Sequence, residues 1–191
     1  MCSSVPVRTD FNRAGLLWFK IIFEMRIVKD KTAALVIDIQ ERLFPVMTGK
    51  EELLSNCVKL VKGLQILGIP LMVTQQYTKG LGETINEVSA AINNFGYIEK
   101  RDFSCCGETE VMTRLVELKA EHILLCGIES HVCVLQTALD LKESGFTPVI
   151  VADAVSSRSQ VSIDLAKERF RHEGIMMTSV ESLLFELTRS S

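Results

Sequence analysis

The sequence has little of what nucleic-acid-binding and membrane-spanning proteins need. Its 191 residues carry 21 Lys and Arg against 24 Asp and Glu, a formal charge of −3, so no basic excess is available to neutralise phosphate groups. Aromatic residues make up only 6%, which leaves few rings for stacking on bases. No uninterrupted apolar run reaches the roughly 18 residues of a membrane span. We therefore expect neither nucleic acid nor membrane as a partner.

Metal-binding and cofactor-binding motifs are also missing. The chain has three histidines and six cysteines, but they form no C-x-x-C or H-x-E pair of the kind found in zinc sites. No G-x-G-x-x-G or phosphate-loop pattern follows the first predicted strand, which argues against a nucleotide- or flavin-binding protein. The cysteines lie in apolar stretches, which favours reduced thiols and a cytoplasmic location over a disulfide framework. We expect no metal and no cofactor.

The composition is that of a globular protein, with 47% hydrophobic and 24% charged residues, and the length predicts one domain. The first 24 residues contain two apolar stretches, 14–19 and 21–23, separated by Lys20. A signal peptide and a mitochondrial presequence are alternatives for this segment, but Lys20 interrupts the apolar core and Asp10 opposes a presequence. We predict an N-terminal extension over 1–24 and a functional domain over 25–191.

From residue 29 onward, short apolar runs alternate with longer amphipathic ones. Continuous apolarity is typical of strands buried on both faces of a parallel sheet. The runs predict strands at 33–37, 69–74, 97–100, 122–126, 148–152 and 175–177. Apolar residues at steps of three and four predict helices at 53–67, 85–92, 109–118, 132–143, 161–172 and 180–187. This alternation predicts an α/β fold with three α/β/α layers, doubly wound around a mostly parallel sheet of about six strands.

Three chemically distinct side chains follow or end predicted strands. Asp38 follows the first, Lys100 ends the third, and Cys133 stands near the start of the helix after the fourth. Because the carboxyl ends of parallel strands share one edge of the sheet, these residues are candidates for a common site. An ammonium and a helix N-terminus both favour a thiolate, and a carboxylate can accept the proton of a thiol. The pattern indicates nucleophilic catalysis by cysteine.

Four segments carry a resemblance to a known family. They read Val-Ile-Asp-Ile-Gln at 36–40, Glu-Lys followed by Phe-Ser within 99–104, Gly-Ile-Glu-Ser-His-Val-Cys-Val at 127–134, and Asp-Ala-Val-Ser-Ser-Arg-Ser at 153–159. In this order, on successive predicted strands, they resemble the isochorismatase-like cysteine hydrolase superfamily, and within it the isochorismatase domain-containing branch. The resemblance runs from about residue 29 to residue 187.

The resemblance implies a triad of Asp38 as general base, Lys100 as the cation that stabilises the thiolate, and Cys133 as nucleophile. It also implies an oxyanion hole from the backbone N–H groups of Glu129 and Cys133, built around a non-proline cis peptide between Ile128 and Glu129. The mechanism it implies is attack by Cys133 on a carbonyl-like carbon, followed by hydrolysis of a thioester-type intermediate. The expected function is metal-independent hydrolysis of a C–N bond in a small molecule.

The sequence departs from some members of this family. Nicotinamidases of the superfamily carry a metal site after the second strand, but residues 74–82 here contain neither His nor Asp. Isochorismatases proper often lack the nucleophilic cysteine, so its presence in this chain argues against isochorismate as substrate. A vinyl-ether hydrolase of isochorismatase type and a non-catalytic interaction or scaffold protein stay as alternatives to amide hydrolysis. The candidate lining of a substrate pocket is Gln40, Phe44, Gln76, Phe103 and Arg158.

The remaining polar and thiol groups have plainer interpretations. Asp153 is expected to cap a helix or anchor a loop. The adjacent Cys105 and Cys106 are read as two inert thiols rather than a redox pair, and His131 as a solvent or core residue. The resemblance also implies a homo-oligomer, a dimer or larger, in which partner subunits help to close the pocket.

Overall fold

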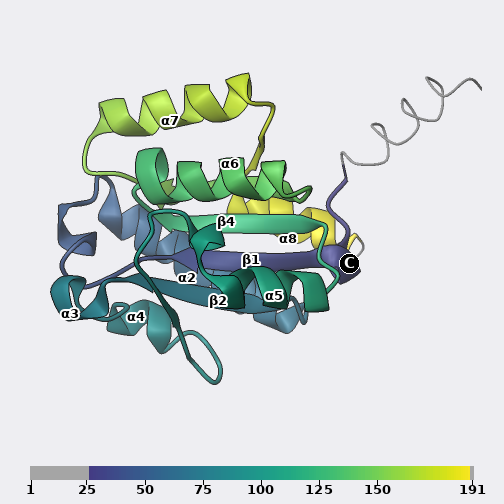
Figure 1. Cartoon of the computed structure of the whole chain (residues 1–191), viewed down its shortest axis with the longest axis horizontal. Helices are drawn as coiled ribbons and strands as arrows, with labels where there is room; N and C mark the ends of the chain where they lie inside the picture. The colour runs from purple at the N-terminus through teal and green to yellow at the C-terminus, as the bar shows by residue number, and fades with distance from the viewer. Residues whose placement is uncertain (1–25, 190–191) are drawn as a thin grey trace, which may run out of the picture.

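The computed structural model describes residues 26–189, which form a parallel sheet between two layers of helices (Figure 1). The strands of this part are β1 (Thr32–Ile37), β2 (Leu71–Gln76), β3 (Ile98–Lys100), β4 (His122–Ile128), β5 (Thr147–Ser156) and β6 (Met176–Thr178). Its α-helices are α2 (Lys50–Ile66), α3 (Thr78–Leu81), α4 (Asn86–Ser89), α5 (Thr109–Glu117), α6 (Leu135–Glu143), α7 (Gln160–His172) and α8 (Val180–Thr188). Short helical turns are η1 (Lys29–Lys31), η2 (Phe44–Val46), η3 (Cys105–Gly107) and the π-helical η4 (Ser130–Val134). The predicted extension over 1–24 lies outside the described residues, and its boundary stays a prediction.

The strand order is β3-β2-β1-β4-β5-β6, and every neighbouring pair is parallel. The chain therefore builds outward from β1 to β3, crosses back, and builds outward again from β4 to β6. The carboxyl ends of β1 and β4 lie at the point where this order reverses. Loops diverge there, and that divergence makes it the usual ligand site of such sheets. The predicted doubly wound α/β fold is confirmed, with all pairs parallel across residues 26–189.

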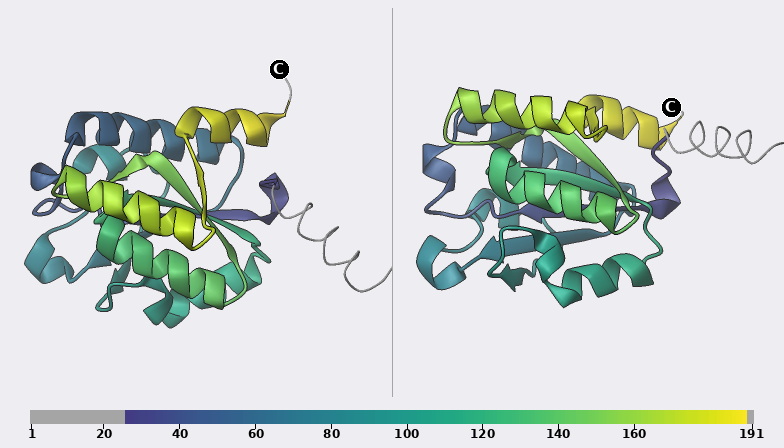
Figure 2. Two further views of the ribbon diagram at one scale, coloured as in Figure 1. Left: turned by 90° about the horizontal axis from the view of Figure 1, so that it is seen from above. Right: turned by 45° about the horizontal axis from the view of Figure 1, so that its top comes forward.

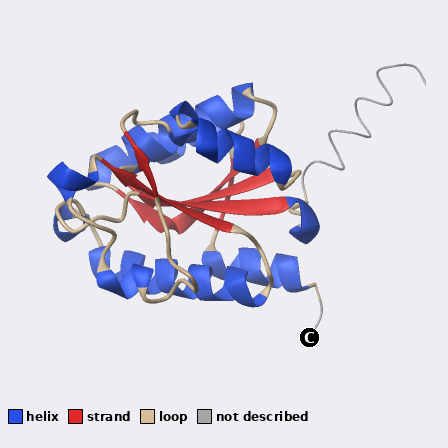
Figure 3. Cartoon of the chain, turned by 60° about the horizontal axis from the view of Figure 1, so that its bottom comes forward, coloured by secondary structure: helices blue, strands red, loops and turns tan. Residues whose placement is uncertain are grey.

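The two helix layers follow from alternation along the strands. In β1, Ala34 and Val36 face one apolar cluster, whereas Ala33, Leu35 and Ile37 face the other. Helices α2, α4 and α8 contribute to the first cluster, and α5, α6 and α7 to the second (Figure 3). Burial on both faces explains the continuous apolar runs. Across residues 26–189, no helix is long and apolar enough to cross a membrane.

The largest departures from the predicted elements lie around α4 and at the end of β5. The helix predicted over 85–92 is only the short α4, and the polar stretch before it contains the unpredicted turn α3. Strand β5 continues to Ser156 rather than stopping at residue 152. It does so because Ala154 and Val155 bury their side chains in opposite clusters, whereas Asp153 turns its carboxylate to the backbone N–H of Val180 at 2.9 Å. Asp153 therefore caps helix α8 from within a strand.

One glycine lets β1 and β4 approach each other next to the reversal of strand order. Gly127 adopts φ +132°, and a Cβ placed there would lie 2.1 Å from the carbonyl oxygen of Ile37. Only glycine combines this backbone conformation with so close a contact. The approach matters because Asp38 follows Ile37 directly.

Gly127→Ala should lower the free energy of unfolding by about 3–5 kcal/mol, because backbone strain and overlap with β1 add together. Gly145→Ala is the matched control, since Gly145 also has positive φ, +87°, but nothing lies within 4 Å of its Cβ position. It should cost only about 1–2 kcal/mol. Urea denaturation measures both, and equal losses would contradict the close approach.

Candidate active site

A buried ion pair joins two strands that are not neighbours. Asp38 follows β1 and Lys100 ends β3, with β2 between them in the sheet. The lysine side chain nevertheless brings its Nζ to 2.7 Å from Asp38 Oδ2, and both side chains are essentially buried, 0% and 1% exposed. A lysine is long enough to reach across the last residues of the intervening strand, which a shorter cation could not do. A cation that pairs with Asp38 from this position on β3 therefore needs a side chain as long as lysine.

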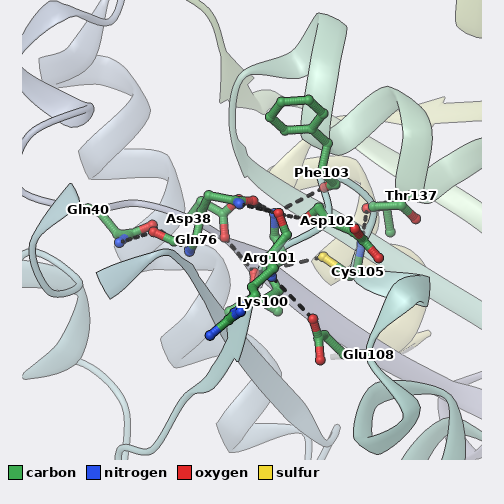
Figure 4. Close-up of polar contacts among 12 residues, drawn as sticks. Asp38, Gln40, Gln76, Lys100, Arg101, Asp102, Phe103, Cys105, Glu108 and Thr137 are labelled. Carbon is green, nitrogen blue, oxygen red and sulfur yellow. Dashed lines mark hydrogen bonds and ion pairs between the residues drawn. The ribbon is translucent and has the colours of Figure 1, made fainter. Parts of the chain in front are cut away.

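The Lys100 ammonium has three further acceptors (Figure 4). They are Gln76 Oε1 at 2.6 Å, the carbonyl oxygen of Asp102 at 3.1 Å and that of Phe103 at 3.0 Å. Burial alone lowers the pKa of Lys100, but the Asp38 carboxylate counters this effect and the net pKa is raised. The site therefore keeps a positive charge at neutral pH despite its depth.

Asp38 is held from its own side by strand β2. Thr74 Oγ1 donates to Asp38 Oδ1 at 2.9 Å, and the backbone N–H of Asp38 donates to the carbonyl of Thr74 at 3.2 Å. Asp38 itself has φ +53°, a left-handed conformation that is uncommon outside glycine. The same Thr74 hydroxyl lies 3.8 Å from Cys105 Sγ, which places a second buried thiol beside the ion pair. Thr74 and Cys105 were missed in the sequence because neither stands in a recognisable motif.

The Cys133 thiol lies on η4, directly after the turn that follows β4, and the residue is 6% exposed. Burial and the charge of the Asp38 carboxylate raise its pKa to about 12, while Lys100 opposes the rise. The stabilisation of a thiolate by the ammonium and the helix start stays a prediction for the reacting state. Lys100 acts in the predicted direction, but burial and Asp38 outweigh it. The site holds a neutral thiol beside a carboxylate that can take its proton.

The turn between β4 and η4 is built without the expected cis peptide. All peptide bonds between described residues are trans, including Ile128–Glu129. The chain turns instead through Gly127 at φ +132° and Glu129 in the left-handed region at φ +58°. The carbonyl of Glu129 accepts from the N–H of Val132 at 2.9 Å, which closes the turn. The oxyanion role of the Glu129 and Cys133 N–H groups stays a prediction.

Side chains from the end of β5 brace this turn. The Glu129 carboxylate pairs with Arg158 Nε at 2.7 Å and lies 3.4 Å from His131 Nδ1. Ser157 Oγ lies 2.6 Å from Ser130 Oγ and 3.0 Å from His131 Nδ1. Sequence reasoning missed Ser130 and Ser157, although both stand inside the quoted family segments. His131 belongs to this bracing network, which differs from the solvent or core role expected for it.

The candidate pocket residues divide into two groups. The side-chain amide of Gln40 hydrogen-bonds to backbone groups. Its Nε2 donates to the carbonyls of Gln76 and Gly82, and its Oε1 accepts from the N–H of Gln76. It therefore positions Gln76, whose side chain contacts Lys100 and the carbonyl of Arg101.

Among the other candidates, Phe103 accepts a hydrogen bond from Lys100 through its backbone carbonyl. The residue as a whole is 55% exposed. Arg158 is engaged by Glu129. Phe44 packs, half-buried, against the α2-side cluster. Within residues 26–189, no group of three or more His, Cys, Asp or Glu is arranged to hold a metal ion.

Lys100→Met should lower the free energy of unfolding by about 3–5 kcal/mol, because it leaves the Asp38 carboxylate buried without its partner. Lys31→Met is the control, since its 2.6 Å pair with Glu121 is about half exposed and should be worth no more than about 1 kcal/mol. The Asp38→Asn, Lys100→Met double variant should lose less than the sum of the single losses. Urea denaturation of the wild type, the three single variants Asp38→Asn, Lys100→Met and Lys31→Met, and the double variant measures these losses. Additive losses in the double variant would contradict the coupling.

The resting charge of Cys133 is testable by thiolate absorbance near 240 nm, taken as the difference between the wild type and Cys133→Ser. With a pKa of about 12, no Cys133 thiolate should appear between pH 6 and 9. Asp38→Asn should lower the pKa, because it removes a negative charge and leaves Lys100 nearby. Lys100→Met should not bring the thiolate into this range. A wild-type thiolate titrating near pH 7 would overturn the neutral-thiol assignment.

Comparisons with known proteins identify the family of the chain. The isochorismatase domain family model matches residues 32–182. The chain is 35% identical over 184 residues to isochorismatase domain-containing protein 1 of Salmo salar, covering 96% of this chain and 61% of that protein. It is 40% identical over 151 residues to the Danio rerio protein of the same name, covering 78% and 53%.

Among solved structures, the MAR1 ribonuclease of Caenorhabditis elegans is 35% identical, with a TM-score of 0.82 over 87% of this chain and 85% of that one. The chain thus spans only about half to three fifths of the two fish proteins, but most of the nematode structure. The family model covers far more than half of the chain and includes Asp38, Lys100 and Cys133. The chain belongs to the isochorismatase family.

Proposed function

We propose that the chain is a metal-independent cysteine hydrolase that cleaves a C–N bond in a small amide-type substrate. The observation that supports this most directly is the buried Asp38–Lys100 ion pair beside the Cys133 thiol. A neutral nucleophile, an adjacent proton acceptor and a fixed cation form the set that acyl transfer through a cysteine needs. Family membership points to hydrolysis, and these residues supply the step.

The reaction proceeds in two halves. As Cys133 Sγ attacks the carbonyl carbon, its proton passes to Asp38, and the N–H groups of Glu129 and Cys133 receive the developing oxyanion. The tetrahedral intermediate then collapses: the C–N bond breaks and the proton moves from Asp38 to the leaving amine. This leaves a thioester. Asp38 next takes a proton from water, which attacks the thioester, and the returned proton restores the thiol as the carboxylic acid leaves.

The raised pKa of Cys133 favours this assignment over a preformed thiolate. An amine is a poor leaving group unless it is protonated, so a proton carried from the thiol to Asp38 is then available where it is needed. Lys100 pairs with Asp38 at 2.7 Å and fixes its orientation between steps. The burial of all three residues restricts the reacting group to a small or slender one.

We also propose that a second copy of the chain closes the site. The strongly exposed apolar side chains Val46, Tyr77 and Phe103 stand on the segments that follow β1, β2 and β3, at the same edge of the sheet as Lys100. Exposed apolar groups around a polar site are typical of interfaces. The reduced thiols favour a cytoplasmic location for this assembly.

An activity screen tests the proposed reaction. The substrates are small primary amides, carbamoyl compounds, vinyl ethers and a short single-stranded RNA, which enters because the nematode relative is named a ribonuclease. We expect turnover of an amide or carbamoyl compound, and a loss of about 10³-fold or more in Cys133→Ala. Cys106→Ala is the matched control, since this half-buried thiol contacts the carbonyl of Thr137, and it should keep activity within about threefold.

The other outcomes each contradict part of the proposal. Turnover that survives Cys133→Ala would overturn the nucleophile. Cleavage confined to vinyl ethers or RNA would overturn the bond class. Absence of turnover on every substrate would favour the non-catalytic scaffold.

A further inference from the structure

Strand β5 extends past its outer neighbour and leaves a space between the helix layers. It pairs with β6 only from Val149 to Val151, so residues 152–156 have no strand beside them on that side within the described chain. Helices α2 and α7 flank this overhang from opposite layers of the sheet; Figure 2 shows both helices from two directions. The space is a cavity of about 510 Å³. This is within the size range of small-molecule sites.

Helix α7 presents two unpaired cations to the cavity. Gln160, Ile163, Lys167 and Arg171 line it, and their spacing of three, four and four places them on one face of the helix. Within residues 26–189, neither the Lys167 ammonium nor the Arg171 guanidinium makes a hydrogen bond or ion pair. In contrast, the Arg169 guanidinium on the same helix pairs with Glu173 at 2.8 Å. The two positive charges that line the cavity therefore have no direct partner in the described chain.

The opposite wall holds the start of a helix that already carries acids. Helix α2 has 17 residues and begins after Gly49, which is left-handed and gives no side-chain cap. Gly49 and Glu52 both line the cavity, so the first turn of α2 opens onto it. Glu51 and Glu52 stand in this first turn, so carboxylates already offset its positive end. An anionic group is therefore favoured on the α7 wall, at Lys167 and Arg171.

Two acids and several hydroxyls complete the lining. Glu52 forms no ion pair with Lys167 or Arg171, and Asp153 has one oxygen committed to α8. Carboxylates at such positions accept hydrogen bonds from hydroxyl groups, and Thr178 adds a hydroxyl of its own. A ligand that carries a doubly charged anionic group at one end and hydroxyls at the other matches both walls.

We propose that this cavity binds a small hydroxylated organic phosphate, with the phosphate on Lys167 and Arg171 of α7 and the hydroxyls toward Glu52 and Asp153 on the opposite side. The lining contains none of Asp38, Lys100 and Cys133, so this binding site is separate from the candidate active site. It does not depend on the proposed hydrolase activity.

Isothermal titration calorimetry of the full chain with sn-glycerol 3-phosphate tests the site. We expect saturable binding that is tighter than that of inorganic phosphate and no binding of glycerol. Lys167→Gln and Arg171→Gln should each weaken binding about tenfold, because each removes a charge-assisted contact. Arg169→Gln is the matched control on the same helix and should leave binding unchanged. Cys133→Ser should also leave it unchanged, which separates this result from the fate of the hydrolase proposal.

Several outcomes would overturn the site. These are the absence of binding at millimolar ligand, equal weakening by Arg169→Gln, and inorganic phosphate that binds as tightly as sn-glycerol 3-phosphate. Because Lys167 is only half-buried and Arg171 is exposed, their substitution should leave the thermal midpoint within a few degrees. Chemical shift changes in the amide spectrum on titration should map to α7 and the start of α2, and changes around Cys133 instead would also overturn the proposal.

Discussion

The ion pair between Asp38 and Lys100 is the constraint on which the site depends. Two opposite charges lie fully buried at 2.7 Å, and neither would be stable there alone. Holding them together requires the lysine stem to cross the last residues of β2, Thr74 to donate to Asp38, and Gln76 with two carbonyls to receive the ammonium. The carboxyl edge of three strands is therefore arranged around one electrostatic contact.

That contact also influences the protonation state of Cys133, the candidate nucleophile. A cation beside a thiol ordinarily favours the thiolate, but here the cation is already neutralised by the carboxylate that faces Cys133. The sulfur therefore stays protonated and has a proton acceptor next to it. Strained backbone concentrates at the same place, with left-handed Asp38 and Glu129 on either side of the Gly127 contact. Such strain is maintained only where surrounding contacts determine the backbone, and the Glu129–Arg158 pair and the Ser157 network supply them.

The sheet carries two polar regions of opposite character. The candidate active site is closed, with each charge satisfied within the protein. The cavity beside the β5 overhang is open. The side-chain charges of Lys167 and Arg171 in its lining have no partner in the described chain. Both arise from topology: the first from the reversal of strand order between β1 and β4, the second from a strand of ten residues beside one of three.

Local pattern in the sequence determined the strands, the helix layers and the family, because side-chain period and apolar run length report burial residue by residue. It also determined Asp38, Lys100 and Cys133 as candidates, since each stands at a strand end in a recognisable segment. Only the tertiary structure decided how they interact: that Lys100 passes β2, that Cys133 is neutral, that Gln40 serves the backbone, and that Ile128–Glu129 is trans. Protonation and hydrogen bonding depend on neighbours distant in the chain, which no local period encodes.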